Sequence, residues 1–323
     1  MVDTLELAAR HLAVRRRTAA ATVLGAVREW RAVNPADLSE SWMAQLPRLL
    51  AVVSAGQLAA AGSAQSYTDA ATIAQGSIPD KAGHVNPAAF AGFASDGRDL
   101  ASLLYLPVID TKEAIGSGSS LREALCIGER KLRLLVDTQV ADAGRGADGV
   151  GITADRTLTG YVRVISGGAC GRCALLAGKY YAFNRGFARH PHCHCQHLPV
   201  ARHSKLRPPT VDARDYFASL SPAQQSKAFT VAGARAIRDG ADISAVVNAR
   251  RSLYTAAGRP GGTRLLATRE GMTKRGLAFK RLKALEAAGR APARMRLTPD
   301  AIYKLASDRD DAIRLLHRYG YLF

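Results

Sequence analysis

The sequence lacks the local patterns that usually mark an enzyme's active site. It contains no Ser/His/Asp triad, no paired-carboxylate pattern, no phosphate-binding loop and no dinucleotide-binding fingerprint. The run GSGSS, residues 116–120, is not a nucleophile elbow, because such an elbow follows a strand and exposes its serine beside partner residues. We therefore expect a protein that is not an enzyme.

Long apolar runs and a secretion signal are also lacking. The most apolar stretch, 49–64, is rich in Ala, Gly and Ser and is shorter than a membrane span, so it predicts a buried helix. Asp3 and Glu6 stand where a signal peptide would carry basic residues, and no compact apolar segment follows them. We expect neither a membrane partner nor export by that route.

Acidic residues are scarce relative to basic ones. The chain of 323 residues has 27 Asp and Glu against 45 Lys and Arg, a net charge of +18, which favours an anionic partner, with nucleic acid ahead of a membrane surface. The excess is greatest in the basic segment 259–296, where 11 basic side chains face 2 acidic ones. The candidate nucleic-acid-binding residues are Arg259, Arg264, Lys274, Arg275, Lys280, Arg281 and Lys283.

Cysteine is rare and unevenly placed. Four of the five cysteines lie in the stretch 170–195, and an odd total with this clustering favours a metal site in a reducing cytoplasm over a disulfide framework. A Cys-x-x-Cys pair can present two thiolates to one metal, and the cluster HPHCHC at 190–195 offers further ligands. We predict structural Zn²⁺. The predicted ligands are Cys170, Cys173 and Cys193, with one or both of His190 and Cys195 completing the set.

Two other uses of these cysteines are less consistent with the pattern. A redox dithiol of the form Cys-Gly-Arg-Cys normally opens a helix in a thioredoxin-like unit and would not need the second cluster. A catalytic metal would need a general base, and no Asp or Glu lies between Cys170 and His203. A structural metal is therefore preferred, with unliganded buried cysteines as the remaining alternative.

The same stretch resembles a known family. Its elements are Cys170-x-x-Cys173, Leu-Ala-Gly at 176–178, a tyrosine pair, Arg-His-Pro-His-Cys-His-Cys at 189–195 and Leu-Pro-Val at 198–200. Together they are similar to the signature of the phage Mu protein F-like (MuF-like) minor capsid proteins, in the version of tailed phages that infect actinobacteria. His194 departs from that pattern, since such proteins often carry an acidic residue there.

The resemblance implies a fold and a function. Members have a helical N-terminal region followed by a domain with the Cys/His signature, and they are structural proteins of the virion. It implies assembly in the host cytoplasm, inside the procapsid near the portal, with the portal protein or the major capsid protein as partner. Packaged double-stranded DNA is a further candidate partner. The rival interpretation is a zinc-dependent nucleic-acid-binding protein or nuclease.

Hydrophobic spacing predicts an α+β, mostly helical fold: a long-helix N-terminal region, a zinc-stapled α+β domain and C-terminal helices. Predicted helices cover 3–33, a region from 37 kinked or divided at Pro47, 100–115 interrupted at Pro107, 120–143, 221–239, 242–251 and 273–288, with two short ones after 298 and 307. Capping boxes are predicted at Ser120 with Glu123 and at Ser221 with Gln224. Predicted strands are 157–166 and 198–200. A boundary at the glycine-rich segment 144–151 separates a predicted domain 1–145 from a predicted domain 152–250. A third predicted domain, 251–323, contains the basic segment and the C-terminal helices.

Side-chain roles follow from these elements. Arg15, Arg16 and Arg17 are expected to form a solvated helix face, with DNA contact as the alternative, and Cys126 is expected in the core of its helix. The aromatic cluster 180–187 is expected to pack over the metal, with stacking on bases as the alternative. The apolar end 319–323 is expected to be exposed and to dock in a partner's groove.

Overall fold

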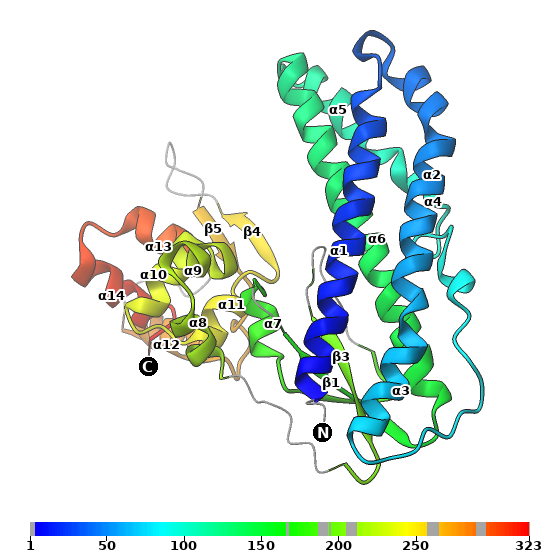
Figure 1. The fold of residues 1–323 in the computed structure, drawn as a ribbon. Helices are drawn as coiled ribbons and strands as arrows, with labels where there is room; N and C mark the ends of the chain where they lie inside the picture. The colour runs from blue at the N-terminus through cyan, green and yellow to red at the C-terminus, as the bar shows by residue number, and fades with distance from the viewer. Residues whose placement is uncertain are drawn as a thin grey trace. The chain divides into compact units, whose positions relative to one another are not determined.

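The α+β, mostly helical fold class predicted from the sequence is confirmed by the computed structural model (Figure 1). The structure describes residues 4–165, 168–186, 193, 195–204, 212–256, 265–288 and 295–322. The chain divides into two units, which we describe separately: unit one is 1–166 with 177–210, and unit two is 167–176 with 211–323. The three-part division predicted from the sequence stays a prediction.

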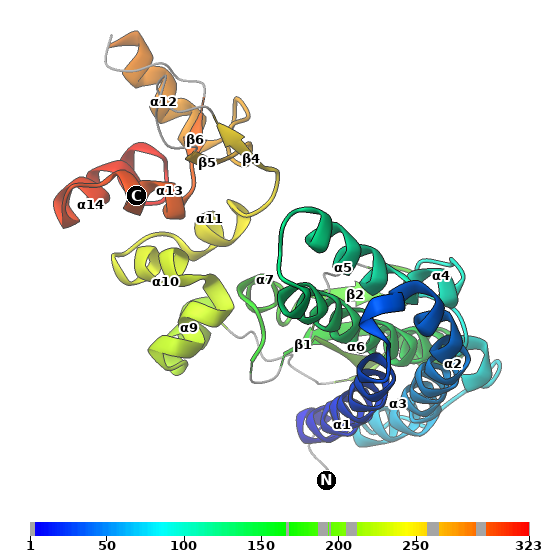
Figure 2. The same cartoon turned by 90° about the horizontal axis from the view of Figure 1, so that it is seen from above.

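Three long helices form the body of unit one. Figures 1 and 2 show α1 (Thr4–Arg31), α2 (Leu38–Gly62) and α6 (Leu121–Ala154) side by side. The shorter helices of this unit are α3 (Ala64–Ala74), α4 (Leu100–Leu104) and α5 (Leu106–Gly116). Each long helix buries one stripe of small and apolar side chains against its neighbours. In the part of the chain that the structure describes, no helix is both long and apolar enough to cross a membrane.

Two tryptophans join the helices at one end of this bundle. Trp30 of α1 and Trp42 of α2 meet edge to face, with ring centroids 5.2 Å apart, and both are buried. Each indole nitrogen donates to a carbonyl of a further helix: Trp30 to Leu125 of α6 at 3.3 Å, and Trp42 to Leu104 of α4 at 3.1 Å. Each buried indole nitrogen is therefore hydrogen-bonded, and these bonds fix the positions of the helices.

The helix α6 is longer than predicted. Ser120 and Glu123 form the predicted capping box at its start, but the helix continues to Ala154, through the glycine-rich segment that was expected to be a domain boundary. Its glycines provide space for neighbours: a Cβ on Gly144 would lie 2.8 Å from Nε of Arg15. Close packing therefore outweighs the low helix propensity of glycine, and the segment 144–151 is helical rather than a connector.

The buried stripe of α6 does not include Cys126, which was expected in the core. Cys126 is exposed rather than in the core, and Leu121 is 48% exposed. The stripe instead starts with Ala124 and Gly128, and a Cβ on Gly128 would lie 2.4 Å from the Trp30 ring. The stripe continues through Leu132 and Val136, which are both fully buried.

Helix α2 runs unbroken past Pro47, which was predicted to kink or divide it. Proline cannot donate to the carbonyl four residues earlier, here that of Met43. Met43 and Pro47 are both exposed, so the missing hydrogen bond lies on the solvent-facing side of the helix.

A three-stranded antiparallel sheet completes unit one. Both predicted strands are present, as β1 (Leu158–Val164) and β3 (Gln196–Ala201), and β2 (Tyr180–Ala182) pairs with the other side of β1. The outer edge of β3 is covered by the Gln75 side chain, which donates to the carbonyl of Pro199 at 2.9 Å and accepts from the amide of Ala201 at 3.1 Å. A side chain thus occupies an edge that could otherwise pair with another strand.

Unit two contains short helices and a second antiparallel sheet that the sequence pattern did not predict. The sheet has the order β4 (Leu253–Ala256), β5 (Leu265–Thr268), β6 (Arg296–Leu297). Its helices are α7 (Gly171–Leu175), α8 (Ala213–Ser219), α9 (Pro222–Phe229), α10 (Val231–Arg238), α11 (Ile243–Asn248), α12 (Leu277–Ala287), α13 (Pro299–Leu305) and α14 (Arg309–Arg318).

The predicted helix 221–239 is two helices. Ser221 and Gln224 form the predicted capping box of α9, but the chain breaks at Thr230, whose φ is +70°. That conformation is strained for a β-branched residue, and it is stabilised here because the Thr230 hydroxyl accepts from the amide of Gly233 and caps α10.

The chain end is buried, contrary to the expectation of an exposed docking segment. Tyr321 is fully buried, Tyr319 and Leu322 are each 8% exposed, and Phe323 lies outside the described residues. The Tyr321 hydroxyl donates to the carbonyl of Leu297 at 2.9 Å. Tyr319 and Tyr321 therefore belong to the core of unit two.

The close approach at Gly128 gives a stability test. A Cβ there would lie 2.2 Å from Oγ1 of Thr111 and 2.4 Å from the Trp30 ring, so Gly128→Ala should reduce the free energy of unfolding by about 1–3 kcal/mol. The matched control is Gly149→Ala in the same helix, where a Cβ meets nothing within 4 Å; it should leave stability unchanged or raise it by up to about 1 kcal/mol. Urea unfolding measures both. Equal effects of the two changes would contradict this account.

Candidate metal centre and its buried polar support

Three of the clustered cysteines lie together. The sulfur atoms of Cys173, Cys193 and Cys195 are all within 4.8 Å of one another, and all three residues are buried. The Sγ atoms of Cys193 and Cys195 are 2.9 Å apart. A buried group of three thiols, with no carboxylate in it, is a soft-ligand set that could hold a metal ion.

The donor chemistry fits zinc. Zn²⁺ binds thiolates at about 2.3 Å in a tetrahedron, and a closed structural site takes four ligands, so this group supplies three. Cys170, which was also predicted, precedes α7 as its N-cap residue and is not in the group of three. His190 lies outside the described residues. The identity of the fourth ligand stays a prediction.

Local sequence explains where these cysteines lie. Cys173 is in the short helix α7, whose first residue, Gly171, faces the Phe229 ring so closely that a Cβ would lie 2.6 Å from it. Cys193 and Cys195 precede β3, and pairing of β3 with β1 begins directly after them, with Gln196 opposite Val164. A helix start and a strand start therefore fix the sulfur positions.

Two buried arginines contact the Cys193 residue. Arg145 of α6 donates to its carbonyl at 2.8 Å and pairs with Asp142, and Arg163 of β1 donates to its sulfur at 3.8 Å. Arg163 is only 1% exposed. A guanidinium beside a thiol favours the thiolate that binds a metal. Neither arginine was identified from the sequence, although Arg163 is conspicuous as a charged residue inside a strand of apolar neighbours.

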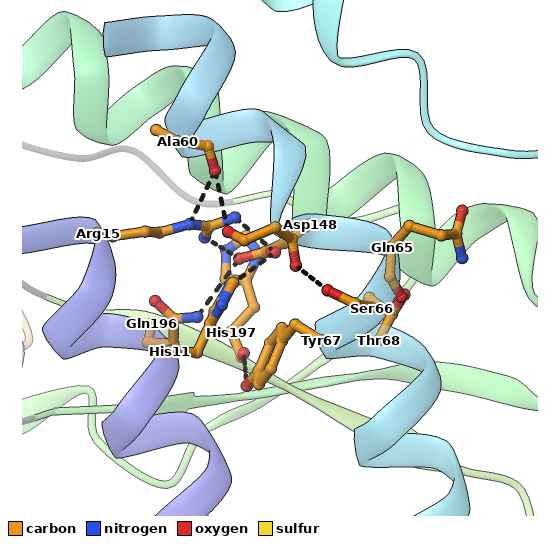
Figure 3. A network of polar contacts seen from close by, with 11 residues as sticks. His11, Arg15, Ala60, Gln65, Ser66, Tyr67, Thr68, Asp148, Gln196 and His197 are labelled. Atoms are coloured by element: carbon orange, nitrogen blue, oxygen red, sulfur yellow. Dashed lines mark hydrogen bonds and ion pairs between the residues drawn. The ribbon is translucent and has the colours of Figure 1, made fainter. Parts of the chain in front are cut away.

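A buried ion pair lies next along the same helix (Figure 3). The Asp148 carboxylate is fully buried and binds the Arg15 guanidinium through both oxygens, at 2.8 Å for the Nη2–Oδ1 bond. Arg15 also donates from Nε to the Ala60 carbonyl at 3.2 Å. Arg15 was expected in a solvated patch or on DNA, and both expectations are wrong for this residue, because its charge is neutralised inside unit one.

Further polar groups complete the network around Asp148. Nε2 of His11 lies 3.3 Å from Oδ1 of Asp148, and the Gln196 side-chain amide donates to Oδ2 at 3.4 Å. The His11 ring stacks on Tyr67, with centroids 3.8 Å apart, and the Tyr67 hydroxyl donates to the carbonyl of His197 at 2.7 Å. The network therefore links α1, α3, α6 and β3, as Figure 3 shows.

Burial and charge set the protonation states in this network. Burial alone would raise the pKa of the Asp148 carboxyl, but the Arg15 charge and the His11 hydrogen bond hold it below its ordinary value. Burial lowers the pKa of His11, against the opposing effect of Asp148. Burial also raises the pKa of Tyr67. The resulting state has an ionised Asp148, a neutral His11 and a neutral Tyr67, with Arg15 as the balancing charge.

The predicted nucleic-acid-binding residues fall into three groups. Arg281 is half-buried and donates from Nη1 to the backbone carbonyls of His317 and Leu322, while Arg259 and Arg264 lie outside the described residues. The exposed ones are Lys274, Arg275, Lys280 and Lys283.

The described part of the aromatic cluster is in β2 and just after it, and Phe187 lies outside the described residues. Tyr180 and Phe183 are about half exposed, at 47% and 48%, whereas Tyr181 stacks on Tyr161. Packing over the metal and stacking on bases both stay predictions.

Comparison with known proteins gives a family match. Residues 2–223 match the model of the family described as VG15 protein, which is more than half of the chain. No curated protein and no solved structure matches.

The cysteine group gives a test of metal binding. The full chain, purified without chelator, should contain about one zinc per molecule, and Cys173→Ser should lose most of it and melt at a lower temperature, because metal binding stabilises the folded state. Cys126→Ser is the matched control, since Cys126 is exposed and outside the group. Elemental analysis and thermal melting provide the readouts. Full zinc content in Cys173→Ser would show that the group does not hold the metal.

The ion pair gives a second test. At pH 7, Asp148→Asn should reduce the free energy of unfolding by about 3–5 kcal/mol, because it leaves the Arg15 charge buried without its partner. Asp80→Asn, which breaks the exposed pair with Arg156, should cost at most about 1 kcal/mol.

The difference in the free energy of unfolding between wild type and Asp148→Asn should change with pH in one direction. The folded-state pKa of Asp148 is lowered, so its contribution is fully present above the unfolded value of about 3.9 and is lost as the pH falls through the folded value. Denaturant unfolding from pH 7 to pH 3 should therefore show the gap between wild type and Asp148→Asn narrowing at the acid end. A gap that widens on acidification would refute the assignment of an ionised Asp148.

Proposed function

This chain belongs to the VG15 protein family, which is a viral family, and from that premise we propose that it is a minor capsid protein of a tailed phage, acting in head assembly. The observation that carries the proposal is the family match over residues 2–223. That range contains the whole MuF-like signature at 170–200. The grouping of three signature cysteines supports the same assignment.

In this proposal the metal is structural. Zinc, when bound, supplies folding energy to a segment too short to build its own core. The chain contributes Cys173, Cys193 and Cys195 as ligands, and Arg145 and Arg163 hold the Cys193 segment in position. The group contains no carboxylate that could act as a general base, which favours a structural protein over the zinc-dependent nuclease.

The proposed location is the virion, at the portal vertex or the inner face of the capsid. The proposed protein partner is the portal protein or the major capsid protein. The helical region offers a surface for it, because α2 has exposed small and apolar side chains at Ala51, Ala55, Leu58 and Ala59. Packaged DNA is a second proposed partner, through the exposed basic residues on and before α12, since phosphate contacts need basic side chains that reach solvent.

The test is incorporation into particles. Mass spectrometry of gradient-purified virions should detect this chain at a fixed ratio to the major capsid protein, and the phage's non-structural proteins serve as the negative control. Co-expression with the portal and capsid proteins, followed by sedimentation, should place the chain in the particle fraction. A chain absent from virions, which stays at the top of the gradient while shells form without it, would overturn the proposal.

A further inference from the structure

The helices α12 and α14 of unit two border a surface groove of about 550 Å³. Its apolar lining comes from Ala284 and Leu285 of α12 and Leu315 of α14. The two leucines are only partly buried, although each belongs to a helix that buries another leucine in the core, Leu282 and Leu316 respectively. The groove therefore has an apolar strip that the core of unit two does not cover.

The rest of the lining is basic. Arg281, Arg314 and Arg318 surround the apolar strip together with His317, and no acidic residue is among the lining residues. Arg314 pairs with Asp311, but Arg281 donates to backbone carbonyls and Arg318 lies 5.7 Å from the Tyr319 ring centroid. Among the described residues, neither Arg281 nor Arg318 has a carboxylate partner. Within the described ranges, two positive charges at the groove thus have no negative counterpart.

We propose that this groove binds an acidic amphipathic helix of a partner protein. Two or three aliphatic side chains on one face of that helix would cover Leu285 and Leu315, and flanking Glu or Asp residues would pair with Arg281 and Arg318. The apolar strip favours this partner over DNA. A duplex presents charged phosphates to such a surface and would leave the leucines uncovered. The inference goes beyond the proposed function and does not depend on it.

The probe is a fluorescent synthetic peptide of about 15 residues, with leucines at helical spacing (i, i+3, i+7) between glutamates. Two matched peptides separate the contribution of charge from that of apolar contact. One replaces every glutamate with lysine, and the other keeps the glutamates and replaces every leucine with serine. Fluorescence anisotropy with the full chain should show binding of the first peptide, weakened by salt, and at least about tenfold weaker binding of both others.

Variants locate the binding at the groove. Arg318→Glu and Leu285→Ser should each weaken binding of the leucine–glutamate peptide by about tenfold or more, whereas Lys304→Glu, an equal charge change at an exposed position on α13, should not. Melting curves check that each variant is folded. If Arg318→Glu fails to fold, Arg318→Gln takes its place, with a smaller but measurable loss.

Two results would overturn the proposal. The first is equal binding of the serine and leucine peptides, together with displacement of both by a short DNA duplex, which would make the groove a general polyanion surface. The second is unchanged binding of the leucine–glutamate peptide to both groove variants. Neither result bears on incorporation into virions, so this inference and the proposed function can fail separately.

Discussion

The buried pair of Arg15 and Asp148 is the constraint on which the arrangement of unit one depends. Removing two charges from water costs several kcal/mol for each ion, and that cost is offset only when both are fully paired. Asp148 meets this condition with Arg15, His11 and Gln196, which come from α1 and from the start of β3. A shift of α1, α6 or β3 would leave a charge unpaired in the core. The pair therefore selects one arrangement of these elements over others that bury similar apolar area.

The same helix face extends this constraint to the cysteines. Arg145 is three residues before Asp148, so both side chains project from α6 on the same side, and Arg145 holds the Cys193 carbonyl. Cys193 and Cys195 directly precede Gln196, which contacts Asp148. The positions of these two sulfurs are thus set by helix packing before any metal binds. Ligands positioned in this way need little rearrangement of the surrounding helices to bind an ion.

The sequence predicted structural features that are set by neighbouring residues, but not those that are set by residues far apart in the chain. The capping boxes at Ser120 and Ser221, the strand β1 and the importance of the clustered cysteines all follow from short-range patterns. The burial of Arg15 does not, because its partner lies 133 residues away. The continuation of α6 through its glycines was missed for a related reason. Glycine lowers helix propensity locally, but it allows the Arg15 side chain of another helix to approach Gly144.

The buried arginines also change what the net charge implies about partners. Arg15, Arg145, Arg163 and Arg296 are each at most 5% exposed, so none of them can contact a phosphate. Arg296 donates to the carbonyls of Tyr319, Glu270 and Gly320, as a structural cation rather than a surface one. Since counterion release counts only phosphates that are contacted, the charge of +18 overstates the DNA-binding capacity of the chain. The argument for an anionic partner therefore rests on where exposed cations gather, and among the described residues α12 is one such place.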